Sequence, residues 1–150
     1  MKLGFASDHR GFSLKRKLIE YFNSKDVECF DVGAFNGEKS DYPIYAFKLG
    51  EKVANKTYDF GVAICGSGIG ISIASNKVKG VRAAKVDSRD DAVLARIDND
   101  ANIIAFGAET DLEEAKLWIE TFINAEYPEV ERHSRRIIQI RDYEEEANVE

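Results

Sequence analysis

The sequence has few cysteines and prolines and no long apolar run. Its two cysteines, Cys29 and Cys65, make neither a disulfide framework nor a zinc-binding spacing. The longest apolar runs, such as residues 103–106, have the length of a strand and are too short to cross a membrane. The N-terminal segment becomes polar too early, at residues 7–9, for a signal peptide. We therefore expect a cytoplasmic protein of a reducing compartment, without a membrane segment.

Charge and size restrict the function classes further. Asp and Glu number 27 against 21 Lys and Arg, giving a net charge of -6. An acidic chain without a basic stripe is a poor match for the phosphate backbone of nucleic acid, so we expect no nucleic-acid partner. The 150 residues, 44% of them hydrophobic, suffice for one core. The prediction is one domain over residues 1–150.

Short apolar runs alternate with amphipathic stretches along the chain. The predicted strands are residues 2–6, 27–32, 60–65, 81–86 and 103–106. The predicted helices are residues 13–25, 43–55, 66–77, 88–99, a stretch from about 110, and about 130–143, with a mobile tail at 144–150. This alternation predicts an α/β fold with a doubly wound, five-stranded parallel sheet, a Rossmann-like three-layer sandwich.

The segment Cys-Gly-Ser-Gly-Ile-Gly at residues 65–70 is the strongest local motif. Ligands of such folds bind beyond the carboxyl ends of the strands, where this loop is expected. Gly66, Gly68 and Gly70 would let backbone N–H groups approach an anion at the start of a helix. The glycine spacing fits neither a dinucleotide-binding fingerprint nor a Walker loop. The loop therefore predicts a site for an anion or an oxyanion.

Cys65 ends the strand beside this loop. Unpaired N–H groups at a helix start favour a thiolate, which could act as a nucleophile or a base. The alternative for Cys65 is a small buried core residue, and Cys29, within a strand, is expected to be core.

Three further groups of polar residues are candidates for the same site. Asp8 and His9 follow the first strand, although Asp8 could simply cap the next helix. Tyr42, between Asp41 and Pro43, offers a phenol, or only a helix start. Arg132 and Arg136 lie four residues apart, so both could grip one phosphate; the alternative is a solvated face paired with nearby glutamates.

In this order and at these spacings, the motifs resemble the family of ribose-5-phosphate isomerase B and the galactose-6-phosphate isomerase subunits. The resemblance covers nearly the whole chain, including residues 7–12, 41–43, 65–70, 74–78, 99–102 and 132–136. It implies an aldose–ketose isomerase that acts on a phosphorylated sugar through a cis-enediolate, without metal or cofactor. It also implies a homodimer or a dimer of dimers, in which a neighbouring subunit completes each active site.

The resemblance also implies a role for each matching residue. Cys65 would be the base, with Ser67 orienting the substrate and Asp8 assisting ring opening. The backbone amides of Gly66, Gly68, Ile69 and Gly70 would stabilise the enediolate oxygen. The groups that would bind phosphate are His9, Arg132 and Arg136, and those that would bind the sugar hydroxyls are Tyr42 and Asn99.

Two positions depart from the family pattern. Asp98 stands where the family has the His that opens the sugar ring, and a carboxylate is a weaker proton donor at neutral pH. Glu109 stands where many members have a phosphate-binding Arg. Three alternatives follow: ring opening by Asp8 and solvent, a related substrate such as a tetrose phosphate, or one subunit of a hetero-oligomer. A sugar-phosphate-binding protein without turnover is the non-enzyme alternative.

Overall fold

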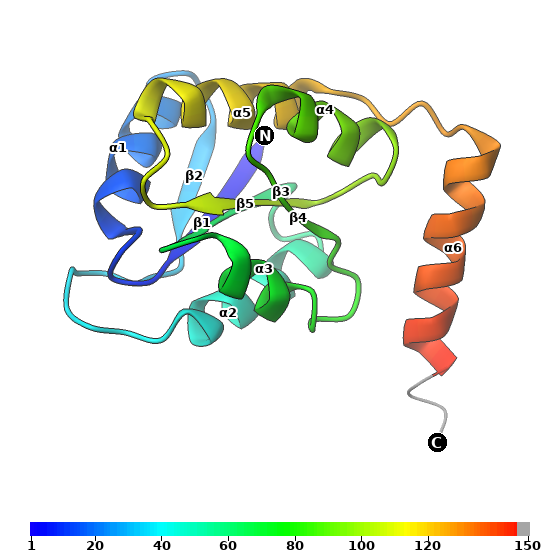
Figure 1. The fold of residues 1–150 in the computed structure, drawn as a ribbon, viewed down its shortest axis with the longest axis horizontal. Helices are drawn as coiled ribbons and strands as arrows, with labels where there is room; N and C mark the ends of the chain where they lie inside the picture. The colour runs from blue at the N-terminus through cyan, green and yellow to red at the C-terminus, as the bar shows by residue number, and fades with distance from the viewer. Residues whose placement is uncertain (147–150) are drawn as a thin grey trace.

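The strands form a single parallel sheet with the order β2-β1-β3-β5-β4 in the computed structural model, which describes residues 1–146. The strands are β1 (Lys2–Ser7), β2 (Glu28–Asp31), β3 (Phe60–Cys65), β4 (Ala83–Lys85) and β5 (Ile103–Gly107). The helices are α1 (Phe12–Asn23), α2 (Tyr42–Ala54), α3 (Ile69–Ser75), α4 (Arg89–Ile97), α5 (Leu112–Asn124) and α6 (Glu131–Glu146). The predicted doubly wound α/β fold is confirmed (Figure 1).

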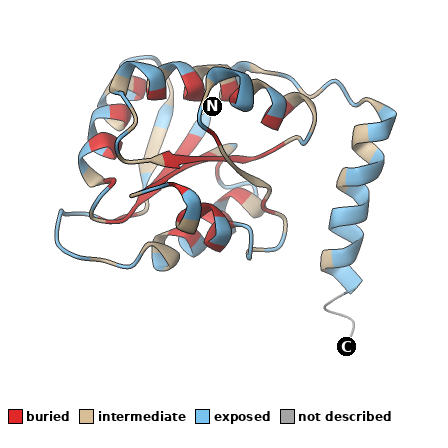
Figure 2. Cartoon of the chain, in the orientation of Figure 1, coloured by how far each residue is buried: buried red, intermediate tan, exposed pale blue. Residues whose placement is uncertain are grey.

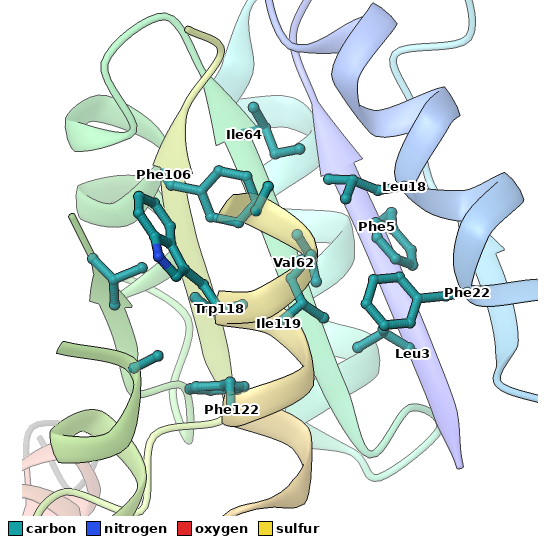
Figure 3. Close-up of a cluster of buried hydrophobic side chains, with 14 of the residues drawn as sticks. Leu3, Phe5, Leu18, Phe22, Val62, Ile64, Phe106, Trp118, Ile119 and Phe122 are labelled. Carbon is teal, nitrogen blue, oxygen red and sulfur yellow. The ribbon is translucent and has the colours of Figure 1, made fainter. Parts of the chain in front are cut away.

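Each face of the sheet is covered by its own set of helices. On one face, α1, α4 and α5 enclose an apolar cluster that includes Phe5, Phe22, Phe106 and Phe122 (Figure 3). On the other face, α2 and α3 enclose a second cluster of smaller side chains around Leu49. The central strands β1, β3 and β5 are buried on both sides, which explains their continuously apolar sequences (Figure 2).

Several predicted boundaries were wrong by two or three residues. The strand expected from residue 81 starts at Ala83, because the backbone N–H of Arg82 donates to the side chain of Asn102 (2.8 Å). The helix expected at 66–77 is shorter, because Gly68 adopts a left-handed conformation (φ 79°) and α3 begins only after it. The last helix runs to Glu146 and so includes part of the predicted tail; residues 147–150 lie outside the described residues.

Helix α6 lies to one side of the sandwich and has no buried residue (Figures 1 and 2). Side-chain contacts join it to the rest of the chain, among them one between the Tyr127 hydroxyl and Ser134 Oγ at 2.7 Å. His133 Nε2 lies 3.3 Å from Asp98 Oδ1, and Glu144 Oε2 accepts a hydrogen bond from the Gly80 N–H at 3.1 Å. Ile138, Ile140 and Tyr143 are exposed on it. Within residues 1–146, no helix is long and apolar enough to cross a bilayer.

Lys15 is a charged side chain in the interior of the fold, with no exposed side-chain surface. Its ammonium donates to Asp31 Oδ1 (2.8 Å) and to the carbonyl oxygen of Ala34 (2.5 Å). Burial lowers the pKa of Lys15, and the partly exposed Asp31 carboxylate opposes this effect. Lys15 thereby fixes the start of the loop between β2 and α2, which leads to Tyr42.

We predict that Lys15→Met lowers the free energy of unfolding by about 1–3 kcal/mol, because it leaves the Asp31 carboxylate and the Ala34 carbonyl without their donor. The exposed Lys17 is the matched control, and Lys17→Met should change stability by less than about 0.5 kcal/mol. Urea denaturation of both variants measures the difference. Equal midpoints for the two variants would contradict the role given to Lys15.

Candidate active site

The turn from β3 to α3 borders a cavity of about 380 Å³ at the carboxyl edge of the sheet. Eight residues from three loops line it: Asp8, Arg10, Tyr42, Cys65, Gly66, Ser67, Ile69 and Gly70. All three loops follow carboxyl ends of parallel strands, which is where such folds bind ligands. Seven of the eight are residues that the sequence singled out for substrate chemistry; Arg10 is the exception.

Cys65 lies between the apolar core and this cavity. The residue is 4% exposed and packs in the cluster beneath α2 and α3, yet it also lines the cavity. Its backbone is fixed by the residue that follows β5, since the Ala108 N–H donates to the Cys65 carbonyl oxygen at 2.8 Å. Cys65 is therefore buried, as a core cysteine would be, and still borders a space that a small ligand could enter.

Cys29 has a different environment. It is partly exposed and packs against the cluster under α1 and α5, so its assignment to the core holds only in part. Burial raises the pKa of the Cys29 thiol to about 11, and the thiol is therefore protonated at neutral pH.

The three glycines of the turn are each approached by a different neighbour. A Cβ at Gly66 would lie 2.6 Å from Arg10 Cζ, and one at Gly70 would lie 2.6 Å from Tyr42 Cζ. A Cβ at Gly68 would lie 2.5 Å from the carbonyl carbon of Phe106. The absent side chains therefore allow the guanidinium, the phenol and strand β5 to close around the turn.

One expected backbone donor in the turn is already engaged. The Ile69 N–H donates to Ser67 Oγ at 3.1 Å, so this amide is not free to bind a substrate oxygen, and the role predicted for it is wrong. Ser67 Oγ itself is placed at the cavity by the same bond. Ile69 contributes its exposed side chain to the lining.

Asp8 is 6% exposed and holds the turn after β1 together. Its Oδ1 accepts hydrogen bonds from the backbone N–H groups of Arg10 (3.0 Å) and Gly11 (3.1 Å). Gly11 is the N-cap residue of α1, and no side chain caps it. Asp8 thus stabilises the turn before the helix and does not cap the helix itself, while its carboxyl group borders the cavity.

His9 and Tyr42 are positioned by the loop between β2 and α2. The backbone N–H of Ser40 donates to His9 Nδ1 (3.2 Å), and the N–H of His9 donates to Ser40 Oγ (3.0 Å). His9 is outside the residues that line the cavity. Tyr42 begins α2, followed by Pro43 in the first turn, so the interpretation as a helix start is confirmed. The residue also lines the cavity, and its role in substrate binding stays a prediction.

The remaining predicted site residues are not at the Cys65 cavity. Asp98 and Asn99 follow α4, at the amino edge of the sheet, one length of β5 (roughly 16 Å) from the carboxyl edge. Asn99 lines a second cavity of about 460 Å³, and Arg136 lines a third of about 570 Å³; Asn76, Ile140 and Glu144 belong to both. Arg132 is exposed on the first turn of α6. One chain therefore holds two separate groups of the predicted residues.

Sequence reasoning missed two residues of these groups. Arg10 was visible as a cation in the loop after β1, between His9 and Gly11. His133 contacts Asp98 only because α6 returns to the end of α4, and no spacing in the sequence indicated that contact. Within residues 1–146, no three His, Cys, Asp or Glu side chains are placed to hold a metal ion.

Comparisons with known proteins agree with this geometry. Residues 3–140 match the family model described as Ribose/Galactose Isomerase. The chain is 39% identical over 148 residues to ribose-5-phosphate isomerase B of Escherichia coli (strain K12), covering 98% of this chain and 99% of that protein.

Two solved structures are also similar to the chain. Ribose-5-phosphate isomerase B of Clostridium thermocellum superposes with a TM-score of 0.94 at 38% identity, over 99% of this chain and 100% of that chain. The enzyme of that name from Mycoplasma genitalium, with bound ribulose-5-phosphate, gives 0.90 at 37% identity, over 97% of each chain.

We predict that Gly68→Ala destabilises the protein by about 2–4 kcal/mol, because it combines a positive φ with a collision against the Phe106 backbone. Gly37→Ala is the matched control: nothing lies closer than 3.9 Å to its Cβ, and its stability should change by less than about 0.5 kcal/mol. Thermal unfolding compares the variants. A Gly68→Ala variant as stable as Gly37→Ala would mean that the turn does not need its glycine.

Proposed function

The chain belongs to the ribose/galactose isomerase family, and we propose that it interconverts ribose 5-phosphate and ribulose 5-phosphate. The proposal rests on one observation above all: Cys65 borders a cavity at the carboxyl edge of the sheet, together with Asp8, Ser67 and Tyr42. It is supported by the names of the relatives, which are ribose-5-phosphate isomerases B at 37–39% identity over almost their whole length.

The reaction needs a base that moves a proton between two neighbouring carbons. The Cys65 thiolate removes the hydrogen from C2 of the open-chain aldose as a proton. The C1=C2 double bond forms, and negative charge develops on O1. The hydroxyl proton of O2 is then transferred to O1, and the thiol returns its proton to C1, which leaves the C2 carbonyl of the ketose. No atom is gained or lost, and the thiolate is regenerated.

The other groups at the cavity take supporting roles in this proposal. Ser67 Oγ and the Tyr42 phenol bind sugar hydroxyls, and Asp8 assists the opening of the ring. Gly68 is not among the residues that line the cavity, so the N–H groups of Gly66 and Gly70 are the amides that we retain for the enediolate oxygen. A preorganised donor of this kind is worth about 3 kcal/mol. A thiol base must stay reduced, which fits the cytoplasm.

A second copy of the chain would bring the two separate groups together. A symmetric dimer can place the α6 residues of one subunit at the Cys65 cavity of the other. Exposed apolar side chains on α2, α3 and α6 supply surfaces for such a contact: Ile44, Phe47, Ile69, Ile73, Ile138 and Ile140. We therefore propose a homodimer, or a dimer of dimers, in which Arg132 and Arg136 bind the phosphate beside His9 of the other subunit.

Asp98 and Asn99 would enter the site from the same second copy. Asn99 would bind a sugar hydroxyl. We retain Asp98 as a second group, beside Asp8, that assists ring opening, together with the imidazole of His133 that it contacts at 3.3 Å. Because Asp98 and Glu109 depart from the family pattern, a related phosphosugar that needs no ring opening, such as a tetrose phosphate, is the second candidate substrate.

We predict that Cys65→Ala lowers the kcat for ribose 5-phosphate by about 10³-fold or more, because the base is removed. Cys29→Ala is the control and should keep wild-type kcat, since that thiol lies away from the cavity. The assay should include tetrose and hexose phosphates. If wild type turns over none of these substrates faster than Cys65→Ala, the isomerase proposal is contradicted and the protein only binds sugar phosphates.

For the shared site, we predict that Arg136→Ala mainly raises KM, because a phosphate contact is made equally in the ground and transition states.

Mixing Cys65→Ala with Arg136→Ala and exchanging their subunits should restore about a quarter of wild-type activity at substrate concentrations below KM. Half of the dimers would then carry one intact site out of two. Light scattering reports the oligomeric state. A monomeric chain, or no recovery on mixing, would contradict the shared site, and recovery only with a different partner chain would indicate a hetero-oligomer.

A further inference from the structure

Arg10 is a cation at the Cys65 cavity that the proposed mechanism does not yet use. Its guanidinium lies against the backbone of Gly66: a Cβ added to Gly66 would be 2.6 Å from Arg10 Cζ and 3.0 Å from Nε. Nη1 is also among the atoms nearest to that position. The planar group therefore lies over the residue that follows the thiol, in the space that only a glycine leaves open.

The guanidinium has no partner of its own among the described residues. Arg10 makes its hydrogen bond through the backbone N–H, which donates to Asp8 Oδ1. Two other arginines of the chain differ in this respect, because Arg82 and Arg96 are each held by Asp100 and by backbone carbonyl oxygens. A guanidinium carries five N–H donors. Those of Arg10 are available to a ligand in the cavity.

The position of Arg10 decides which part of the substrate it meets. For proton transfer, C1 and C2 must lie within about 3–3.5 Å of the Cys65 sulfur. The residue next to that sulfur therefore faces the carbonyl end of the sugar, whereas the phosphate is at the opposite end of the carbon chain. Negative charge develops on O1 as the enediolate forms, and the charge-assisted hydrogen bond of an exposed guanidinium such as that of Arg10 stabilises it.

We propose that Arg10 is a catalytic residue, whose guanidinium donates to the enediolate oxygen of the substrate bound at Cys65. The inference rests on the proposed isomerase function and adds a group to it. Besides its backbone N–H, Gly66 contributes the space that the guanidinium occupies, because it has no side chain.

The first experiment compares Arg10→Met and Arg10→Lys with Arg16→Met, an exposed arginine on α1 outside the cavity. Arg10→Met should lower kcat by about 10- to 100-fold with KM changed less than about threefold, because the contact forms mainly in the transition state. Arg10→Lys should recover part of the loss, and Arg16→Met should match wild type. An unchanged kcat, or an effect confined to KM, would overturn the proposal.

The second experiment moves the guanidinium without removing it. Gly66→Ala requires no positive φ, and its Cβ would collide only with the flexible end of Arg10. It should lower kcat as Arg10→Met does, and the double variant should be no slower than the slower single variant. Multiplied losses in the double variant would show that the two residues act independently, which contradicts the proposed contact.

A binding measurement separates this inference from the isomerase function itself. Calorimetry with a phosphorylated hydroxamate, which imitates the enediolate, should show affinity lowered about tenfold or more in Arg10→Met. Affinity for a sugar-alcohol phosphate, which has no carbonyl group, should be unchanged. Equal losses for both probes would assign Arg10 to the phosphate end. If wild type isomerises no phosphosugar, the proposed function itself is contradicted.

Discussion

The structure of the candidate site depends on how closely other parts of the chain approach the turn between β3 and α3. Three glycines alternate with Ser67 and Ile69 in this turn, and each missing side chain is replaced by a different group. The Arg10 guanidinium lies over Gly66, the Phe106 backbone abuts Gly68, and the Tyr42 phenol covers Gly70. The loops after β1 and β2, and strand β5 itself, are thereby held around the thiol of Cys65. Without these close approaches the cavity would have a different lining.

The parallel sheet explains why the predicted residues fall into two groups. Side chains after β1, β2 and β3 meet at the carboxyl edge, whereas Asp98 and Asn99 follow α4 and belong to the amino edge. Helix α6 packs no residue into the core and presents Arg132 and Arg136 on the outside. Because α6 buries no side chain, it adds little to the stability of a single chain. Contact with a second copy would give the helix both a packing partner and a function.

Much of the fold could be predicted from the sequence because apolar runs alternate with amphipathic stretches, and this pattern admits few topologies. The position of Asp8, Tyr42, Cys65 and Ser67 at one cavity follows from the same rule, since all of them end or follow parallel strands. What could not be predicted depends on tertiary contacts. The start of β4 is displaced by the Asn102 side chain, and the Ile69 amide is taken by Ser67. The contact between His133 and Asp98 requires α6 to return to the end of α4.

The central claim is that the Cys65 thiol carries a proton between two carbons of a sugar phosphate. The most direct test follows the exchange of the C2 hydrogen of ribose 5-phosphate in heavy water by NMR, because a thiol proton exchanges with solvent whereas a hydride shifted between carbons does not. The account predicts that wild type introduces deuterium into substrate and product and that Cys65→Ala does not. Deuterium incorporation by Cys65→Ala at the wild-type rate would contradict it.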